Sequence, residues 1–223
     1  MNPIAHIHTP FPTKFGVPRQ SGIVEDIVGT IVFLPPYRDP NALRGLEQYS
    51  HLWLIWEFSE TSRAEWSPTV RPPRLGGNQR IGVWATRSPF RPNPIGLSSV
   101  RLRSIQLDTP QGPVIEVEGP DLMDGTPILD IKPYLPYTDS HPNALAGFAQ
   151  QPNDPSEHLI VDLPDTLARQ LSSEEVQTLR AVLAADPRPR YHHDASRIYV
   201  MPFGPHQVHF TVDRGILSVV GID

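Results

Sequence analysis

The chain has 223 residues and no cysteine, which excludes disulfides, thiolate nucleophiles and cysteine-ligated zinc. Its length suits one domain of ordinary size or a main domain with an appendage. Proline accounts for 27 residues, well above the average of about 5%, and favours short strands and rigid loops because it breaks helix interiors.

The positive charge is concentrated in one segment, from Thr61 to Arg103. This segment holds eight arginines and one acid, Glu65, so its local charge is +7. Since the whole chain carries −5, the remainder carries −12. A charge asymmetry of this size within one fold predicts a polyanionic partner. The alternative is that acids from elsewhere in the fold neutralise these arginines.

No targeting or membrane-spanning segment is predicted. The start of the chain, "MNPIAHIHTPFPTKFG", lacks the basic end and apolar run of a signal peptide, and no later run reaches the roughly 20 apolar residues of a membrane span, so we expect a cytoplasmic protein.

The first part of the chain is predicted to be mainly β. The segment 41–50 is a candidate short helix. Apolar, β-branched runs bounded by Pro or Gly predict strands at residues 27–34, 51–58, 81–84, 98–102 and 114–118. Such a pattern is typical of a closed barrel or a sandwich.

The sequence changes character near Gln150, where "AQQPNDPSEH" is typical of a linker. After it, Ser172 and Glu175 have the spacing of a capping box, followed by apolar residues on one helical face. Three later runs predict strands, with "DRG" as a hairpin turn: residues 197–203, 206–212 and 216–222. We therefore expect a barrel domain at residues 1–145 and a small α+β subdomain at residues 155–223.

The common catalytic and cofactor motifs are missing. There is no G-x-G-x-x-G, no Walker loop and no G-x-S-x-G elbow, so a doubly wound nucleotide-binding fold is not expected. His206 and His209 would lie on opposite faces of a strand, and His6 and His8 have no adjacent carboxylate as a third ligand. We therefore expect no metal site.

Three stretches carry polar groups suited to a site. "KFGVPRQSG" presents Arg19 and Gln20 directly after a stiff Gly-Val-Pro turn. Glu57 and Glu60 end the most apolar predicted strand, "HLWLIWEF". Around a Gly-Thr-Pro turn, the third stretch supplies three aspartates, although Asp and Gly are also ordinary turn formers: Asp121, Asp124 and Asp130.

Together these stretches resemble the TsaA-like, TrmO-type tRNA methyltransferases. The similar segments occur in the family's order and cover nearly the whole chain: "KFGVPRQSG", "RGLEQYSHLWLIWEF", "TVRPPRLGGNQRIGVWATRSPFRPNPIGLS", "DLMDGTPILDIKPYLPY" and "DPRPRYH". The resemblance implies a small closed β-barrel, not a Rossmann fold, and a homodimer. It also implies S-adenosylmethionine-dependent methylation of N6 of the threonylcarbamoylated adenosine at position 37 of threonine tRNA.

The resemblance further implies which residues hold the methyl donor. The Ser59-Glu60 pair departs from the His-Gln of close family members, and "DPRPRYH" is expected near the active site of the dimer partner. The implied donor-binding residues are Pro18, Arg19, Gln20, Ser59, Glu60, Arg87, Leu97, Asp121, Leu122, Met123 and Asp124.

The chemistry of methyl transfer assigns roles to these groups. A sulfonium donor favours nearby carboxylates, for which Asp121, Asp124 and Glu60 are the candidates. The donor's own carboxylate favours Arg19, Gln20 and Arg87. The acceptor N6 must lose a proton as it attacks, and the sequence leaves the acceptor of that proton open among Asp121, Asp124 and Tyr134.

Five arginines of the positively charged segment are predicted to bind phosphates of the anticodon stem-loop. Trp84, Phe90 or Tyr137 could stack on a base, although Trp84, in a predicted strand, is expected in the core. Two alternative functions remain: methylation of another RNA or a small molecule, and a non-catalytic RNA-binding module. The predicted phosphate contacts are Arg63, Arg71, Arg74, Arg80 and Arg91.

Overall fold

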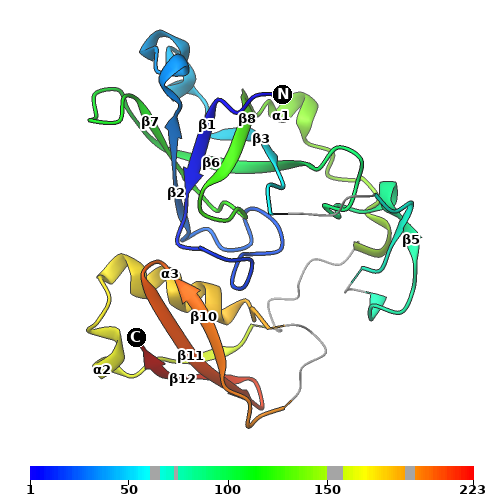
Figure 1. The fold of residues 1–223 in the computed structure, drawn as a ribbon, viewed down its shortest axis with the longest axis vertical. Helices are drawn as coiled ribbons and strands as arrows, with labels where there is room; N and C mark the ends of the chain where they lie inside the picture. The colour runs from blue at the N-terminus through cyan, green and yellow to red at the C-terminus, as the bar shows by residue number, and fades with distance from the viewer. Residues whose placement is uncertain (61–65, 73–74, 150–157, 189–193) are drawn as a thin grey trace.

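A closed six-stranded β-barrel forms the larger part of the protein in a computed structural model (Figure 1). The structure describes residues 1–60, 66–72, 75–149, 158–188 and 194–223. The strand order around the barrel is β1-β2-β7-β6-β3-β8, and all neighbouring pairs are antiparallel. The strands are β1 (Ala5–His8), β2 (Val28–Phe33), β3 (His51–Glu57), β6 (Ile95–Gln106), β7 (Val114–Glu118) and β8 (Thr126–Pro133).

Alternate residues of the barrel strands point inward and are buried. Ile31, Leu52, Leu54 and Ile115 are among the fully buried side chains that fill it. This period of two is the pattern expected of half-buried strands. The predicted closed barrel is confirmed.

Three of the predicted strands match the structure closely, at β2, β3 and β7. The predicted strand at 98–102 is the middle of a longer strand, β6. The prediction at 81–84 is wrong beyond Gly82, where a short hairpin of β4 (Thr69–Val70) and β5 (Ile81–Gly82) gives way to a 3-10 helix at Val83–Ala85.

Two barrel strands, β1 and β8, are absent from the sequence-based prediction. Strand β1 has only four residues, and β8 contains Pro127, Asp130 and Pro133, which are typical of loops. Pairing on both sides, with β1 and β3, holds β8 in the barrel despite its composition. Tertiary context has overridden local preference here.

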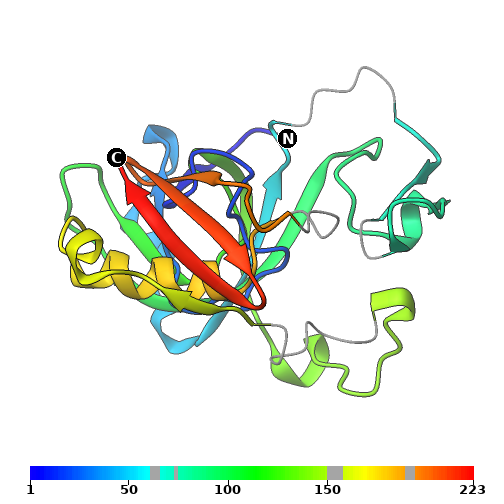
Figure 2. The same cartoon turned by 90° about the horizontal axis from the view of Figure 1, so that it is seen from below.

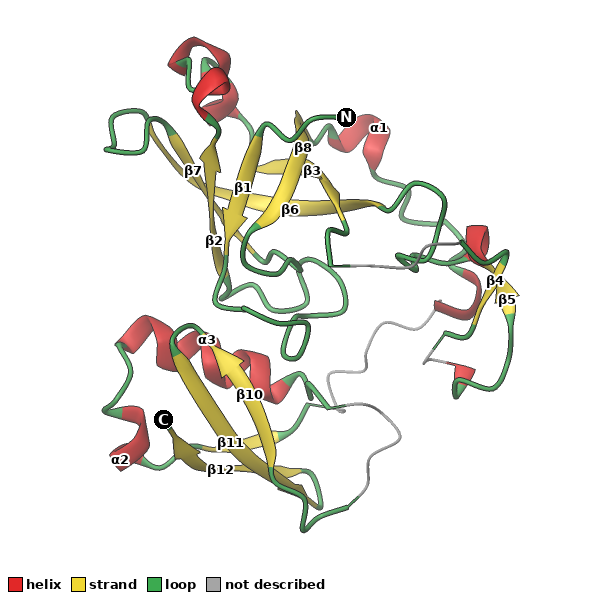
Figure 3. Ribbon diagram, in the orientation of Figure 1, coloured by secondary structure: helices red, strands yellow, loops and turns green. Residues whose placement is uncertain are grey.

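The C-terminal part is a four-stranded sheet with a helix against one face (Figures 1 and 3). Its order is β10-β11-β12-β9, and β9 pairs parallel to β12. The predicted helix and its capping box are confirmed as α3. The elements are β9 (Ile160–Asp162), α2 (Asp165–Ala168), α3 (Ser173–Ala184), β10 (Tyr199–Phe203), β11 (His206–Asp213) and β12 (Ile216–Ile222).

The predicted hairpin turn between β11 and β12 is also present. Arg214 and Gly215 both have positive φ, 46° and 81°, as a type I′ turn requires. The predicted linker at 149–158 lies almost wholly outside the described residues. The short elements of the remaining chain are 3-10 helices at Pro35–Tyr37, Pro40–Leu43, Leu46–Gln48 and Gly147–Ala149, and α1 (Pro136–Asp139).

The loop between β1 and β2 joins the barrel to the C-terminal sheet. Phe11 meets Phe203 edge to face at 6.3 Å, and Phe15 stacks on Phe210 at the same centroid distance. The Thr178 hydroxyl of α3 donates to the backbone oxygen of Asp26. This loop, residues 9–27, contributes Phe11, Val24 and Ile27 to the C-terminal core, so the C-terminal sheet holds in place a loop that belongs to the barrel's sequence.

No helix in the described ranges is both long enough and apolar enough to cross a membrane. The helices that are present are short, and α3, with 12 residues, is the longest of those described. A span through a bilayer needs about 20 apolar residues.

Candidate functional site

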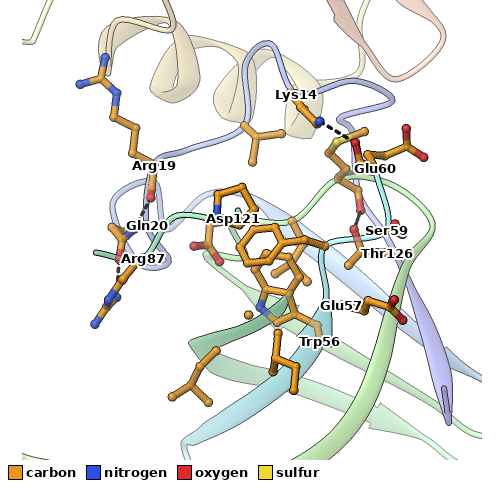
Figure 4. Close-up of a pocket in the computed structure, with 18 of the residues that line it drawn as sticks. Lys14, Arg19, Gln20, Trp56, Glu57, Ser59, Glu60, Arg87, Asp121 and Thr126 are labelled. Atoms are coloured by element: carbon orange, nitrogen blue, oxygen red, sulfur yellow. Dashed lines mark hydrogen bonds between the residues drawn. The ribbon is translucent and has the colours of Figure 1, made fainter. Parts of the chain in front are cut away.

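A pocket of about 680 Å³ lies at one end of the barrel (Figure 4). Strand β3 ends at this rim, while β6 and β8 begin there. The loop 9–27 and the loop between β5 and β6 complete the wall. Apolar and charged side chains therefore meet in one hollow, which suits a ligand that is partly aromatic and partly zwitterionic.

The structure brings together every residue that the resemblance assigned to the methyl donor. These residues come from four separate stretches of sequence, all of which reach the pocket. Its predicted lining residues are Pro18, Arg19, Gln20, Ser59, Glu60, Arg87, Leu97, Asp121, Leu122, Met123 and Asp124. Sequence reasoning had not assigned several other lining residues to the donor: Lys14, Val17, Trp53, Trp56, Glu57, Phe58, Thr86, Pro89, Phe90, Arg91, Ile95, Gly96, Gly125 and Thr126.

Asp121 lies at the end of a buried hydrogen-bond chain. The Trp56 indole Nε1 donates to the Ser98 hydroxyl at 3.0 Å, and Ser98 Oγ donates to Asp121 Oδ1 at 2.5 Å. Burial raises the pKa of the Asp121 carboxyl, and the hydrogen bonds from Ser98 and from the backbone, together with the charge of Arg87, only partly oppose this shift. Asp121 is thus a carboxylate with increased basicity facing a pocket.

Ser98 was not predicted as a site residue, because it has no local base in the sequence. Its side chain is only 1% exposed. Strand β6 alternates inward-facing Gly96, Ser98 and Val100. A hydroxyl at an inward position of an otherwise apolar barrel strand needs a partner, and this is the signal that could have identified it.

Gly96 allows Trp56 to form the pocket's inner wall. A Cβ at Gly96 would come within 2.2 Å of the Trp56 indole. Trp56 also contacts Phe58, with ring centroids 4.2 Å apart. The absence of a side chain at position 96 therefore places the indole flat against β6, where its nitrogen reaches Ser98.

Hydrogen bonds link the loop that carries Arg19 and Gln20 to the loop that carries Arg87. Arg87 Nη1 donates to the Gln20 side-chain oxygen, and Gln20 Nε2 donates to the backbone oxygen of Arg19 (Figure 4). Arg91 donates to the backbone oxygens of Thr86 and Ser88, at 3.2 and 3.3 Å. Arg91 thus stabilises the loop in addition to lining the pocket, so it is less free for phosphate than predicted.

Asp124 and Glu60 have more exposed surroundings than Asp121. Asp124 Oδ1 accepts the Thr9 backbone N–H at 3.1 Å and lies 3.1 Å from His8 Nδ1. Lys14 Nζ donates to the backbone oxygen of Glu60 at 2.9 Å. These contacts hold the two segments at the rim and leave Asp121, which is partly buried, as the least exposed of the three candidate carboxylates.

Tyr134 does not line the pocket. Its ring packs against Trp53 and His51, with centroids 5.6 and 6.1 Å away. Trp53 itself donates from its indole nitrogen to Asp139. Tyr134 thus packs against Trp53, a residue of the pocket wall, but does not line the pocket itself.

The arginine-rich segment divides into two groups. Arg101 pairs with Glu118 at 3.5 Å, and Arg103 pairs with Glu174 at 3.0 Å, so acids from elsewhere neutralise these two. Among the described residues, no carboxylate lies within ion-pair distance of Arg71, Arg80 or Arg87. The predicted contacts Arg63 and Arg74 lie outside the described residues, as does most of "DPRPRYH".

The expectation that Trp84 belongs to the core is wrong. Its side chain is 67% exposed, because the strand that was to bury it ends at Gly82. In the described part of the chain, no three His, Asp or Glu side chains cluster as metal ligands.

The fold and the pocket define a barrel protein with a pocket of ligand size at the strand ends, outside the doubly wound class. Family models match in two parts: the tRNA-methyltransferase O N-terminal domain over residues 6–140, and the TrmO C-terminal domain over residues 156–223. The chain belongs to the tRNA-methyltransferase O family, as its sequence resemblance predicted.

Named relatives agree with this assignment. A tRNA (adenine(37)-N6)-methyltransferase of Escherichia coli is 45% identical, over 84% of this chain and 81% of the relative. A Pseudomonas aeruginosa protein named "Putative S-adenosylmethionine-dependent methyltransferase RcsF" is 37% identical over 100% of this chain and 98% of its own. The crystal structure of TrmO from Pseudomonas aeruginosa covers 100% of this chain and 95% of its own, with a TM-score of 0.80 and 33% identity.

Proposed function

We propose that the protein transfers the methyl group of S-adenosylmethionine to N6 of adenosine 37 in tRNA. Within that activity, we propose the threonylcarbamoylated adenosine of threonine tRNA as the substrate, and a cytoplasmic homodimer as the working form. The single observation that carries the proposal is the pocket, because it gathers the whole predicted donor-binding set at one barrel end.

The residues of the pocket fit S-adenosylmethionine. Its walls offer Trp56, Phe58 and Leu97 for an adenine ring, and Arg19 and Arg87 for a carboxylate. Asp121, Asp124 and Glu57 are acids suited to an amino group, ribose hydroxyls or a cationic sulfur. When bound, S-adenosylmethionine supplies an electrophilic methyl group on a sulfonium.

Asp121 is the residue of this chain best suited to accept the N6 proton. Asp121 lines the pocket, is less exposed than Asp124, and has a carboxyl whose pKa burial raises, whereas Tyr134 does not line the pocket. The Ser98 hydroxyl holds one carboxylate oxygen, and Trp56 in turn holds Ser98. A general base whose pKa lies closer to neutral transfers protons more effectively. Positioning of both partners in one pocket supplies a further share of the rate.

The threonylcarbamoylated base is favoured for a chemical reason. Its N6 is a ureido nitrogen with a delocalised lone pair, so the nitrogen must lose its proton to attack. Asp121, a partly buried carboxylate that lines the pocket, can take this proton. A base in an anticodon loop can also be splayed out without melting a duplex, and the pocket opens at the barrel rim.

Nucleoside analysis of tRNA tests the proposal directly. The purified protein is incubated with labelled S-adenosylmethionine and threonine tRNA that carries the threonylcarbamoyl group. Label on that nucleoside supports the proposal, and its absence contradicts it. Label in another RNA or in small molecules would establish the second function, and tight RNA binding without donor binding would establish a non-catalytic module.

Arg87→Ala should weaken donor binding by about tenfold, the loss expected for one charge-assisted hydrogen bond. The change removes a pocket cation and its link to Gln20. Calorimetric titration with S-adenosylmethionine measures the effect.

Arg71→Ala is the matched control. Arg71 is exposed and does not line the pocket, so donor affinity should stay unchanged while the salt dependence of RNA binding falls by about one unit of slope. An unchanged donor affinity in Arg87→Ala, or a lowered one in Arg71→Ala, would contradict this division of roles.

A further inference from the structure

Two large aromatic side chains lie stacked and exposed beside the pocket. The indole rings of Trp66 and Trp84 are 5.9 Å apart with an interplanar angle of 26°. Their side chains are 49% and 67% exposed. Tryptophan carries a large apolar surface, and an exposed cluster of such surface marks an interaction site more often than chance.

Local structure turns Trp84 outward. The 3-10 helix Val83–Ala85 buries Val83 completely, which leaves the next residue on the opposite side. The Val83 N–H donates to the backbone oxygen of Pro68 at 3.0 Å, and Thr86 N–H donates back to Val83. The segment that carries Trp84 is thus fixed by backbone hydrogen bonds and a buried anchor. The Trp84 indole is therefore held ready for a ligand at little further entropic cost.

Arg91 connects this aromatic pair to the pocket. Its guanidinium lies 5.7 Å from the centroid of the Trp84 ring, and the same residue lines the pocket. The hairpin of β4 and β5, with the 3-10 helix Val83–Ala85 that follows it, forms a lobe to one side of the barrel (Figures 1 and 2). A nucleotide held in the pocket would therefore have its chain neighbours near the Trp66–Trp84 pair.

The charge around the pair favours RNA as the occupant. From Arg71 to Arg103 the sequence contains no acidic residue. Arg80, which donates to the Thr69 hydroxyl at 2.9 Å, is exposed on the same lobe. Stacked aromatic rings among unneutralised cations are typical of single-stranded nucleic acid sites, where rings hold bases and cations hold phosphates.

We propose that Trp66, Trp84 and Arg91 form a stacking platform for an unpaired base that neighbours the target adenosine in the anticodon loop. The proposal rests on the tRNA function proposed above and adds a second contact outside the donor pocket. The platform holds the neighbouring base by its face, so it adds affinity without reading the base's edge. Its energy comes from stacking, which does not release counterions.

The test uses the full-length protein and a fluorescently labelled anticodon stem-loop RNA without donor. Trp84→Ala should weaken RNA binding by about 5- to 150-fold, since base–aromatic stacking contributes about 1–3 kcal/mol per base. Trp66→Ala should weaken it less, and Trp84→Phe should restore most of the affinity because it keeps a stacking ring. The slope of log affinity against log salt should stay unchanged in all three, since no cation is removed.

Tyr37→Ala is the matched control, because Tyr37 is an exposed aromatic, 41% accessible, in a different part of the fold. It should change RNA affinity by less than twofold. S-adenosylmethionine affinity, measured by calorimetry, should be unchanged in every variant. Circular dichroism should show the same fold, since none of the replaced side chains is buried.

Two outcomes would overturn the platform. The first is RNA affinity within twofold of the parent in both Trp84→Ala and Trp66→Ala. The exposed tryptophan pair would then be assigned to an interface with a protein partner. The second is equal weakening in Tyr37→Ala. Binding is measured without turnover, so a protein that binds RNA through Trp84 but methylates no tRNA would contradict the proposed function alone. RNA binding within twofold of the parent in both Trp84→Ala and Trp66→Ala, with normal tRNA methylation by the parent, would contradict the platform alone.

Discussion

Replacing Asp121 by asparagine is expected to lower the rate of methyl transfer by about 100-fold, the lower end of the effect of a general base. The amide keeps the size of the side chain and can still accept the hydrogen bond from Ser98. It cannot take up the proton that leaves N6. Single-turnover methylation of tRNA measures the rate, and calorimetry measures donor binding, which should change far less.

The pH dependence gives this prediction a second readout. Burial raises the pKa of Asp121 above its usual value, and the carboxyl acts as a base only when ionised. The rate should therefore rise with pH through that raised pKa, and Asp121→Asn should lose this ascending limb. A parent enzyme whose rate is flat across the acidic range would contradict the assignment.

As the pH rises, the contribution of Asp121 to stability should fall, whereas the rate of methyl transfer should rise. A raised folded-state pKa means that the folded protein binds this proton more tightly than the unfolded chain does. The contribution of Asp121 to stability is thus present below the unfolded pKa and is lost as the pH rises through the folded pKa. At neutral pH, Asp121→Asn should not lower the melting temperature, so its loss of activity is not unfolding.

Asp130→Asn is the matched control for Asp121. Asp130 lies on β8, pairs with Lys132 at 3.1 Å and does not line the pocket. Its replacement should leave the rate within about twofold, because an exposed ion pair contributes little. Equal losses in the two variants would show that a carboxylate near the barrel rim is needed for another reason than proton transfer.

Gly96→Ala is expected to destabilise the protein by about 1–3 kcal/mol, the usual cost of an overpacked site. The new methyl group would meet the Trp56 indole at 2.2 Å, and Trp56 is almost fully buried. The indole must move, which breaks its hydrogen bond to Ser98 and shifts the pocket wall. Donor affinity should fall by about tenfold, equivalent to about 1.4 kcal/mol.

Gly82→Ala provides the control for that experiment. Gly82 has φ −59° and ψ 138°, which alanine adopts freely, and no atom lies within 4 Å of its added Cβ. Its replacement should be neutral or stabilising by up to about 1 kcal/mol, through the entropy of the unfolded chain. Chemical denaturation measures both variants. Equal effects would show that the contact with Trp56 is not what Gly96 provides.

Much of the local structure could be predicted from the sequence, because it depends on short-range patterns. Strands β2, β3 and β7 are short apolar, β-branched runs bounded by Pro or Gly, and α3 shows a capping box and an apolar face. The hairpin turn at Arg214-Gly215 follows from the "DRG" sequence, in which Gly215 adopts a positive φ freely. The donor-binding set came from the family resemblance rather than from periodicity or spacing, and the structure groups it at one pocket.

Other features depended on contacts between distant segments. The sequence alone determined the mainly β class, the one long helix, the charge asymmetry and the family. Only the tertiary structure decided that Ser98 meets Asp121, that Arg101 and Arg103 are neutralised, and that Trp84 is exposed. The reason is that the burial of a side chain, the pKa of a carboxyl and the partner of an arginine depend on which distant residues the closed barrel brings together. The pattern of residues along one strand does not show which residues lie opposite it in the fold.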